Sequence, residues 1–371
     1  MKEGWEYKKL EECCDVNYGT RVVRSKVSGS EFPVYGGGGE TFRINCYNRE
    51  NCLVVARFAM SKQCTRYVNG KFFLNDSGLT VSPKIDSCLT KELLEKYLLA
   101  NNDLIYSFGR GSAQRNLNMS EFRSMLISFP IDNDEQRRIV SSLDSSFKLI
   151  DEIKEKAQKS LSEAKALFQS ALAEAMEPKE GTLMRKIGDV FTTYAGGTPL
   201  KSQKDYYEGG DIPWLRSGEV CKKYISETEM YITQKGMDNS SAKFYPDNTV
   251  VVAMYGATAA QVGILKIKAT SNQAVCGIIP HKDFIPEYVY YWFLFKQDDL
   301  ASQAQGGAQP NISQIKIKNV LIPILKKEEQ HQIVSHLDKL SSNVKQMEER
   351  YKKMVEECDA LKQAMLRDVF E

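Results

Sequence analysis

The residue types that most often do chemistry are sparse in this chain. It has three histidines, and none has a partner at the spacing that a metal site needs. The nine cysteines are odd in number, two of them are adjacent, and no CxxC pair occurs. This usage argues against a disulfide framework or a zinc site, and it predicts buried or idle thiols.

The motifs of nucleic-acid-modifying enzymes are also missing. There is no Asp/Asn-Pro-Pro-aromatic motif for amino-methyl transfer and no GxxxxGK[S/T] loop for ATP. Pro246-Asp247 could begin a nuclease core, but no acid-x-Lys strand follows it. The run Gly36–Gly39 could cradle a phosphate, yet no helix signal follows directly, so a plain turn is preferred. We therefore expect a non-catalytic chain, and a self-contained methyltransferase or nuclease is the disfavoured enzyme alternative.

Basic, amide and aromatic residues in turns are the better candidates for a binding function. Arginine and lysine can hold phosphates or guanine edges, and asparagine and glutamine can read adenine. The alternative for each residue is a solvated surface charge or a turn-former. The candidates are Arg57, Lys62, Arg66, Arg110 and Arg115 in the first half, and Lys201, Lys204, Arg216, Tyr255, Gln309 and Asn311 in the second.

Four other polar and aromatic residues have a structural interpretation beside the functional one. Asn75 and Asn272 could equally cap local backbone. Trp214 and Trp292 are expected in the core rather than stacked on bases.

Two long stretches must position these candidates. Asp134 to Glu177 is nearly repeated by Glu328 to Glu371, with matching Glu-Gln, Ile-Val and Leu-Asp pairs. Apolar residues recur in steps of four and three, which predicts two long helices with a heptad seam. A single narrow apolar stripe needs a partner, so we expect the two helices to pair. The predicted seams are Ile139, Leu143, Phe147, Ile150, Ile153, Ala157, Leu161, Ala164, Phe168, Ala171 and Ala175, and Ile333, Leu337, Leu340, Val344, Met347, Tyr351, Met354, Cys358, Leu361 and Met365.

A domain-sized repeat precedes each helix. Val54–Phe58 aligns with Val251–Tyr255, and the second half carries extra residues between Thr198 and Val251. Each half reads as short strands, then one amphipathic helix, then a short strand ending at a proline. The strands are Cys52 to Phe58, Lys71 to Leu74, Thr249 to Met254 and Gly263 to Ile267; the helices are Lys91 to Ala100, capped by Thr90, and Pro286 to Ala304; the last strands end at Pro130 and Pro323.

These observations predict an α+β fold with two tandem-repeated globular domains and two long helices that form an antiparallel coiled coil. The expected boundaries are residues 1–133, 134–182 (helix and linker), 183–323 and 324–371. An antiparallel pair would put one domain at each end of a rod, related by an approximate two-fold axis. Such an object can touch two separated places on duplex DNA, which has a dyad of its own.

Composition is that of an ordinary globular protein. Apolar residues make up 42% and charged residues 26% of the 371 residues, and no apolar run approaches a membrane span. The first residues lack the apolar core of a signal peptide, so we expect a cytoplasmic protein without a membrane partner. A net charge of +2 argues weakly against a nucleic-acid binder, although the positive excess lies in the two globular parts.

The ordered motifs resemble those of the specificity subunits of type I restriction-modification systems. Each long helix opens with Glu-Gln-(x)-(x)-Ile-Val-(x)-(x)-Leu-Asp, which follows Pro130 or Pro323 by a few residues and ends at Asp144 or Asp338. The likeness spans essentially the whole chain and departs after Arg57, where Ala59–Lys62 replace the usual glycines. The other shared motifs are Gly196-Gly197-Thr198-Pro199, Asp211 to Arg216 and Asn272-Gln273 in the second half, and Pro33 to Gly39 and Val55-Ala56-Arg57 in the first.

The resemblance implies that each globular part is a target-recognition domain that reads one half of a bipartite DNA site. The helix pair would set the spacer and dock two methyltransferase subunits, which carry S-adenosylmethionine. Restriction subunits, with ATP and Mg, would complete the complex. Four residues at the starts of the long helices could contact a partner or merely cap the helix. They are Glu135, Gln136, Glu329 and Gln330. The alternative function is a coiled-coil structural or adaptor protein that binds no DNA.

Overall fold

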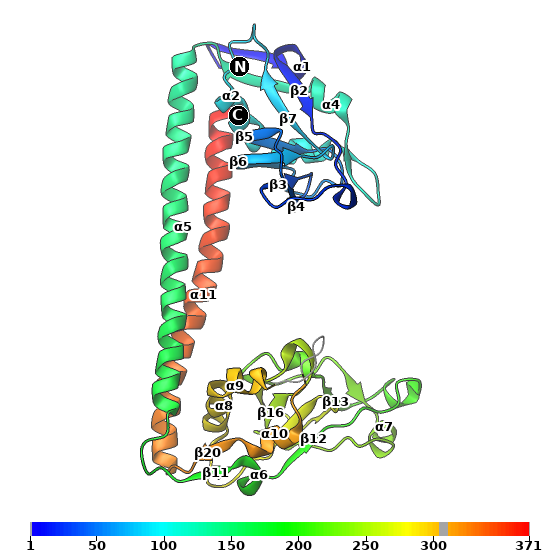
Figure 1. The fold of residues 1–371 in the computed structure, drawn as a ribbon, viewed down its shortest axis with the longest axis vertical. Helices are drawn as coiled ribbons and strands as arrows, with labels where there is room; N and C mark the ends of the chain where they lie inside the picture. Colours follow the sequence, from blue (N-terminus) through cyan, green and yellow to red (C-terminus); the bar gives the residue numbers. More distant parts are fainter. Residues whose placement is uncertain (1, 304–310, 371) are drawn as a thin grey trace. The chain divides into compact units, whose positions relative to one another are not determined.

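The computed structural model describes residues 2–303 and 311–370 and divides into two compact units (Figure 1). The first unit contains the chain up to Gln158 and the chain from Arg350 onward. The second unit runs from Lys159 to Glu349. Both units contain part of each long helix, α5 (Asn133–Met176) and α11 (Lys327–Phe370), so the unit boundaries pass through the helices.

A six-stranded sheet organises the first unit. Its order is β2-β7-β5-β6-β3-β4, antiparallel except where β3 runs parallel to the end of β6. The strands are β2 (Cys14–Tyr18), β3 (Phe32–Tyr35), β4 (Glu40–Ile44), β5 (Arg49–Ala56), β6 (Thr65–Leu74) and β7 (Gly78–Pro83). Residues of β5 are buried on both faces, since Leu53 and Val55 pack in the helix-side core while Val54 packs with Phe72 on the other side.

Helices cover one face of this sheet and lead to the coiled coil. Leu93 and Leu94 of α2 share the core with Leu53, as the apolar spacing of that helix requires. The remaining elements are β1 (Trp5–Lys9), α1 (Leu10–Cys13), α2 (Lys91–Ala100), α3 (Asn102–Ser107), β8 (Gly109–Arg110), β9 (Asn116–Leu117), α4 (Met119–Ser124) and β10 (Leu126–Pro130). Strand β10 pairs with β1 and ends at the proline from which the chain enters α5.

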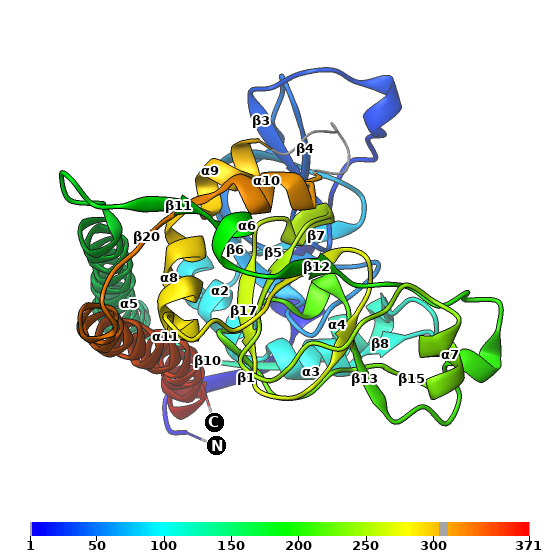
Figure 2. The same ribbon diagram turned by 90° about the horizontal axis from the view of Figure 1, so that it is seen from below.

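The second unit repeats this plan with an addition. Its main sheet has the order β12-β19-β16-β17-β14, and a second sheet has the order β15-β13-β18. The helix α8 packs on β17 and lies beside α11 (Figure 2). The elements are β11 (Met184–Lys186), α6 (Ile187–Val190), β12 (Thr193–Ala195), β13 (Ile212–Leu215), β14 (Tyr224–Ile225), β15 (Tyr231–Ile232), α7 (Gln234–Asp238), β16 (Val250–Ala253), β17 (Val262–Leu265), β18 (Thr270–Ser271), β19 (Val275–Ile278), α8 (Pro286–Phe295), α9 (Gln297–Ser302), α10 (Gln314–Asn319) and β20 (Leu321–Pro323).

The extra residues of the second half explain the addition. Strands β13, β14 and β15 and helix α7 all lie between Thr198 and Val251. The shared part is the sheet β7-β5-β6, which corresponds to β19-β16-β17. In each sheet, one further strand pairs in parallel with the last of these three shared strands. Strand β3 pairs with β6, and β14 pairs with β17.

The long helices form the predicted antiparallel coiled coil. In the first unit, Lys154 pairs with Asp359 at 2.9 Å and Asp151 pairs with Lys362 at 2.5 Å. Three residues forward along α5 therefore correspond to three residues back along α11, which is the antiparallel sense. In the second unit, Lys165 pairs with Glu348 across the two helices at 2.6 Å.

The predicted seam is correct at most positions and wrong at two. Ile153 and Leu361 are 44% and 51% exposed. Lys154 and Lys362 take the inward positions instead, where each pairs with an aspartate of the facing helix. A lysine stem can lie along an apolar seam while its ammonium reaches an acid on the facing helix.

The predicted helix from Pro286 to Ala304 is also only partly correct. The helix α8 ends at Phe295, and α9 begins at Gln297, because Lys296 has a non-helical ψ of 5°. Ala304 lies outside the described residues. The helix Lys91–Ala100 and the strand ends at Pro130 and Pro323 are confirmed, and Gly36–Gly39 is the turn between β3 and β4.

Candidate nucleic-acid interface

A cleft of about 510 Å³ in the second unit brings together three predicted DNA-contacting residues, Lys201, Lys204 and Arg216. It lies among the turn that follows β12, the end of β13 and the turn that follows β18. The complete lining is Thr198, Lys201, Lys204, Tyr207, Glu208, Trp214, Arg216, Met230, Asn272 and Gln273. These residues come from four separate segments, since Met230 lies between β14 and β15, so only the fold assembles them.

The inner wall of the cleft is formed by a buried, hydrogen-bonded tryptophan. Trp214 is 3% exposed and donates its indole N–H to the Gly197 carbonyl at 2.9 Å. A Cβ atom at Gly197 would lie 2.2 Å from the Ala242 nitrogen, so the close approach requires glycine. Asn272 accepts the Ala274 N–H at 3.2 Å, which supports its predicted capping role. The tryptophan is therefore core, as expected, and the polar groups of the cleft rest on it.

The two lysines supply the available positive charge. Lys201 and Lys204 are exposed, and neither forms an ion pair within the described part of the chain. Arg216 differs, because its guanidinium pairs with Glu229 and lies 3.5 Å from Glu219. The cleft thus presents two unpaired ammonium groups beside amide side chains, a combination that suits phosphate oxygens and base edges.

Tyr255 and Asn311 are brought together at another place in the second unit. They form an isolated antiparallel bridge, and both are exposed. The Ile312 N–H donates to the Met254 carbonyl at 2.8 Å and holds the two segments together. Gln309 lies outside the described residues.

In the first unit, Arg57 and Arg66 are adjacent to the glycine turn. The Arg57 guanidinium lies over the rings of Tyr18 at 4.7 Å and Phe58 at 4.5 Å. Arg66 donates to the Gly37 carbonyl at 3.1 Å. These contacts hold the two guanidinium groups against aromatic rings and a backbone carbonyl.

The other three first-unit candidates differ in how they are held. Lys62 is exposed. Arg110 forms a bidentate pair with Glu121 at 2.6 and 2.7 Å. Arg115 donates to the Gly109 carbonyl at 3.0 Å and has a buried Nε atom. Arg110 and Arg115 therefore stabilise local backbone and side-chain structure, as in the alternative in which such residues form turns rather than contact DNA.

The two glutamines predicted to contact a partner are not at the surface. Gln136 is fully buried, accepts from the Thr90 N–H and hydroxyl at 2.8 Å, and donates to the carbonyls of Cys88 and Pro130. This contact also explains why the Thr90 side chain does not cap α2.

Gln330 is equally buried and has the same function in the second unit. It accepts from the Ile285 N–H at 2.9 Å and donates to the carbonyls of Asp283 and Leu325. Each glutamine thus ties the start of a long helix to the start of the domain's helix, α2 or α8. The prediction that these two side chains contact a partner protein is corrected by their burial.

The neighbouring glutamates behave differently. Glu135 and Glu329 are exposed, and Glu329 accepts the Lys326 N–H at 3.1 Å. Glu329 therefore caps α11, in agreement with the capping alternative, because a carboxylate is favoured at a helix N-terminus.

Sequence reasoning missed the function of the aspartates that end the shared motif. Asp144 binds Lys96 of α2, and Asp338 binds Lys223 and Tyr291. Both aspartates dock a domain onto a long helix. The two aspartates occupy equivalent positions in the two repeats, and this equivalence could have indicated a shared function. The residues that they bind could not be predicted from sequence spacing.

Exposed apolar side chains mark a second surface of the first unit. Leu149 and Ile153 on α5 are 59% and 44% exposed, and Leu361 on α11 is 51% exposed. Apolar residues on a helix face away from its partner are candidates for contact with a further protein.

A metal cluster and a membrane-spanning helix place different requirements on the described residues. Residues 2–303 and 311–370 contain no cluster of three or more histidine, cysteine, aspartate or glutamate side chains that could hold a metal ion. Across the same residues, every helix is too short or too polar to cross a membrane. The free thiols include Cys276, whose pKa is raised to about 12 by burial.

Comparison with solved structures supports the fold. A chain from a study of complex assembly and conformational transition of the type I R-M system has a TM-score of 0.75 at 17% identity, over 100% of this chain and 98% of that one. The HsdS subunit from Thermoanaerobacter tengcongensis has a TM-score of 0.56 at 18% identity, over 100% and 97%.

Two curated proteins are similar in sequence. The chain is 28% identical over 271 residues to the type I restriction enzyme EcoR124I/EcoR124II specificity subunit of Escherichia coli, covering 70% of this chain. It is 32% identical over 179 residues to the MjaIX specificity subunit of Methanocaldococcus jannaschii, covering 46% of this chain. The matched regions span 66% and 41% of those subunits, less than two thirds of each.

The family comparison covers most of the chain. The type I restriction modification DNA specificity domain matches twice, at residues 2–163 and 179–357. These matches follow the internal repeat, since each contains one globular domain and most of the long helix that follows it. The chain belongs to the family of type I restriction modification DNA specificity proteins.

Proposed function

We propose that this chain is the DNA sequence-recognition subunit of a type I restriction-modification complex. The observation that carries the proposal is the second-unit cleft, where unpaired Lys201 and Lys204 lie beside Asn272 and Gln273. Lysines would hold the phosphate backbone, and amides would read base edges. The first domain would use Arg57, Lys62 and Arg66 in the same way on the other half of a bipartite site.

The helix pair would set the spacer between the two half-sites. Each long helix has 44 residues, which corresponds to about 66 Å if it is straight. The exposed Leu149, Ile153 and Leu361 would contribute to docking two methyltransferase subunits. Those subunits would supply S-adenosylmethionine, and restriction subunits would supply ATP and Mg chemistry.

In this proposal the chain itself catalyses nothing. Its sequence carries none of the three catalytic motifs sought, and the cleft has the composition of a binding surface. Its ligand, duplex DNA, would place it in the cytoplasm.

The test is the salt dependence of DNA binding by the full chain, alone or with its methyltransferase subunits. Each phosphate contact adds about 0.9 to the slope of log affinity against log salt. We expect Lys201→Ala/Lys204→Ala to weaken binding and to reduce that slope by about 2. The matched control is Lys339→Ala/Lys345→Ala, which removes two exposed lysines from α11.

The outcomes separate the proposal from the adaptor alternative. A steep salt dependence that the cleft variant reduces and the control variant preserves supports DNA recognition. Equal slopes in both variants would exclude the cleft as a phosphate contact. Binding that is absent at low salt in the complete complex would favour a coiled-coil adaptor that does not bind DNA.

A further inference from the structure

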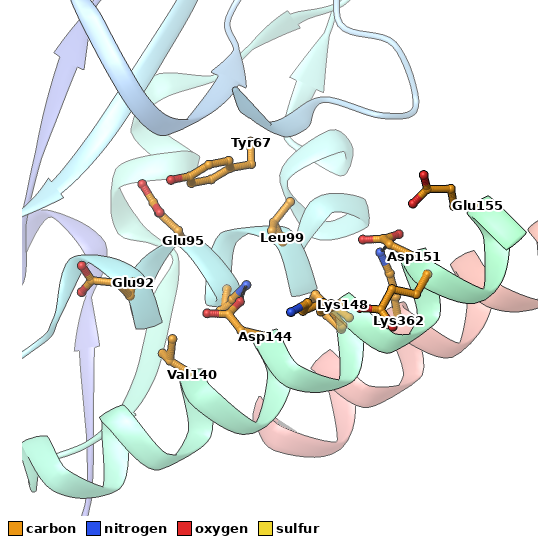
Figure 3. Close-up of a pocket in the computed structure, with 13 residues that line it drawn as sticks. Tyr67, Glu92, Glu95, Leu99, Val140, Asp144, Lys148, Asp151, Glu155 and Lys362 are labelled. Carbon is orange, nitrogen blue, oxygen red and sulfur yellow. Dashed lines mark hydrogen bonds and ion pairs between the residues drawn. The ribbon is translucent and has the colours of Figure 1, made fainter. Parts of the chain in front are cut away.

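A cleft of about 770 Å³ in the first unit lies between the domain and its long helix (Figure 3). Side chains from β6, α2 and α5 face this space, among them Tyr67, Glu92 and Asp144. Phe147 also lines the cleft, and its ring centroid lies 5.1 Å from the Lys96 ammonium and 5.2 Å from the Lys362 ammonium. The lining therefore combines an aromatic ring with charged side chains.

Acidic groups outnumber basic ones around the cleft. Lys96 is bound to Asp144 and Lys362 to Asp151, which neutralises those two pairs. Glu92, Glu152 and Glu155 also line the space, and none of them has an ion-pair partner within residues 2–303 and 311–370. Lys148 is the remaining cation of the lining. The net charge of this surface is negative, so it favours a basic ligand.

The cleft is also bordered by an open strand edge. On one side β6 pairs with β5, with Leu53 opposite Tyr67 and Cys52 opposite Val68. On its other side, β3 reaches only Phe73 and Leu74. The edge of β6 at Tyr67 and Val68 thus has no strand partner in the described part of the first unit. An open edge is a template for adding an extended segment.

The second repeat shows what fills the equivalent edge. Val55 in β5 corresponds to Val252 in β16, and their partners Thr65 and Val262 correspond in turn. Two residues further on, Tyr67 therefore corresponds to Ile264. Strand β14 pairs there in parallel, and the Ile264 N–H donates to the Lys223 carbonyl at 2.7 Å.

The side chains of that strand engage the two equivalent acids. Asp338, the counterpart of Asp144, binds the Lys223 ammonium. Glu287 on α8, the counterpart of Glu92 on α2, accepts from the Tyr224 hydroxyl at 3.3 Å. Burial raises the pKa of Tyr224 to about 12, so the hydroxyl keeps its proton and remains a donor.

The correspondence of the acids follows from the helix geometry. Gln136 and Gln330 each bind the residue that precedes α2 or α8, so these helices start at equivalent places. Lys96 and Tyr291 then occupy equivalent positions, and each contacts the aspartate of its long helix. In the first unit the acids, the helix and the strand edge are present, but no strand equivalent to β14 pairs with that edge among its described residues.

We propose that the first-unit cleft binds an extended segment of a partner protein, which adds in parallel to β6, places an aromatic residue beside Glu92 and lets a neighbouring lysine share the Asp144 carboxylate with Lys96. The segment would reproduce in trans what β14 does within the second unit. This extends the proposed function by giving a partner contact to the first domain, and it does not require DNA.

The experiment uses the full chain and a fluorescent peptide copied from residues 222–227, Lys-Lys-Tyr-Ile-Ser-Glu. Fluorescence anisotropy should show saturable binding of one peptide per chain below about 1 mM. A peptide carrying Lys223→Glu and Tyr224→Ala is the ligand control. Hydrogen exchange should slow at Tyr67 and Val68 only when the first peptide is bound.

Protein variants locate the site. Glu92→Gln and Asp144→Asn should each weaken peptide binding by about tenfold, the effect typical of losing one charge-assisted contact. Asp86→Asn, which changes an exposed carboxylate of the same unit outside the cleft, should leave binding unchanged. Circular dichroism of each variant checks that the fold is kept.

Three results would overturn the inference: no saturable binding up to about 1 mM, equal binding of the control peptide, or equal affinity in the Glu92 and Asp86 variants. None of these readouts involves DNA. A chain that binds the peptide but not DNA would therefore support this inference while contradicting the proposed function.

Discussion

Replacing Gln330 by alanine should detach the start of α11 from the second domain. The glutamine is fully buried and makes three hydrogen bonds of 2.9–3.0 Å, one from the Ile285 N–H and two to the carbonyls of Asp283 and Leu325. Truncation leaves these three backbone groups without their partner in a site of low exposure.

The magnitude follows from those three bonds. A hydrogen bond contributes about 1 kcal/mol net, and an orphaned buried group costs about 1–3 kcal/mol. Alanine regains at most a few tenths of a kcal/mol in helix propensity. We therefore expect Gln330→Ala to lower the free energy of unfolding of the second unit by about 2–4 kcal/mol. Gln330→Glu keeps the shape but turns a donor into a buried carboxylate facing two carbonyls, so it should cost at least as much.

The assay is hydrogen exchange of α8 combined with denaturant unfolding followed by circular dichroism. A loss of about 3 kcal/mol accelerates exchange about a hundredfold. The matched control is Gln332→Ala, two residues along the same helix and exposed, which should change stability by less than about 0.5 kcal/mol. Equal effects of Gln330→Ala and Gln332→Ala would refute the proposed clamp.

Three further outcomes are expected. Reversing either charge of the Lys154–Asp359 pair should cost up to about 1 kcal/mol, and reversing both should restore stability in a double-mutant cycle by thermal unfolding. Burial raises the pKa of Glu95 above its ordinary 4.5, so the folded state favours the protonated carboxyl and the protein loses stability as pH rises through the folded pKa. Glu95→Gln should remove this loss. In urea titrations, the stability of this variant relative to the unmodified protein should therefore increase with pH. Deleting one heptad from each long helix should shorten the spacer by about 10 Å, or about three base pairs, without changing the half-sites in a methylation assay.

The regular parts of the fold followed from local patterns. The heptad spacing predicted both long helices, and the internal repeat predicted that the same sheet and helix would occur twice. Ile153 shows the limit of this reasoning, because hydrophobicity alone assigned it to the seam. The inward position belongs to Lys154, and that depends on Asp359 of the other helix. Register is a property of the pair, which one helix does not encode alone.

The candidate site depended more heavily on tertiary structure. Residue type selected Lys201 and Lys204, which the fold places in one cleft. It could not tell them from Arg110, whose charge is taken by Glu121 eleven residues later. Gln136 was predicted to contact a partner or to cap the helix, whereas its four hydrogen bonds make burial favourable. Contacts of the inserted segment, such as that of Lys223, had no counterpart in the first repeat from which to be predicted.

The most direct test of the central claim is the adenine methylome of the host with and without this gene. If the chain selects the DNA site of a methyltransferase, its loss should abolish methylation at one bipartite motif, and its return should restore that motif. The two half-sites and the spacer would then be read from the same data. An unchanged methylome in a host that expresses the intact methyltransferase subunits would contradict the claim that this chain provides their DNA specificity.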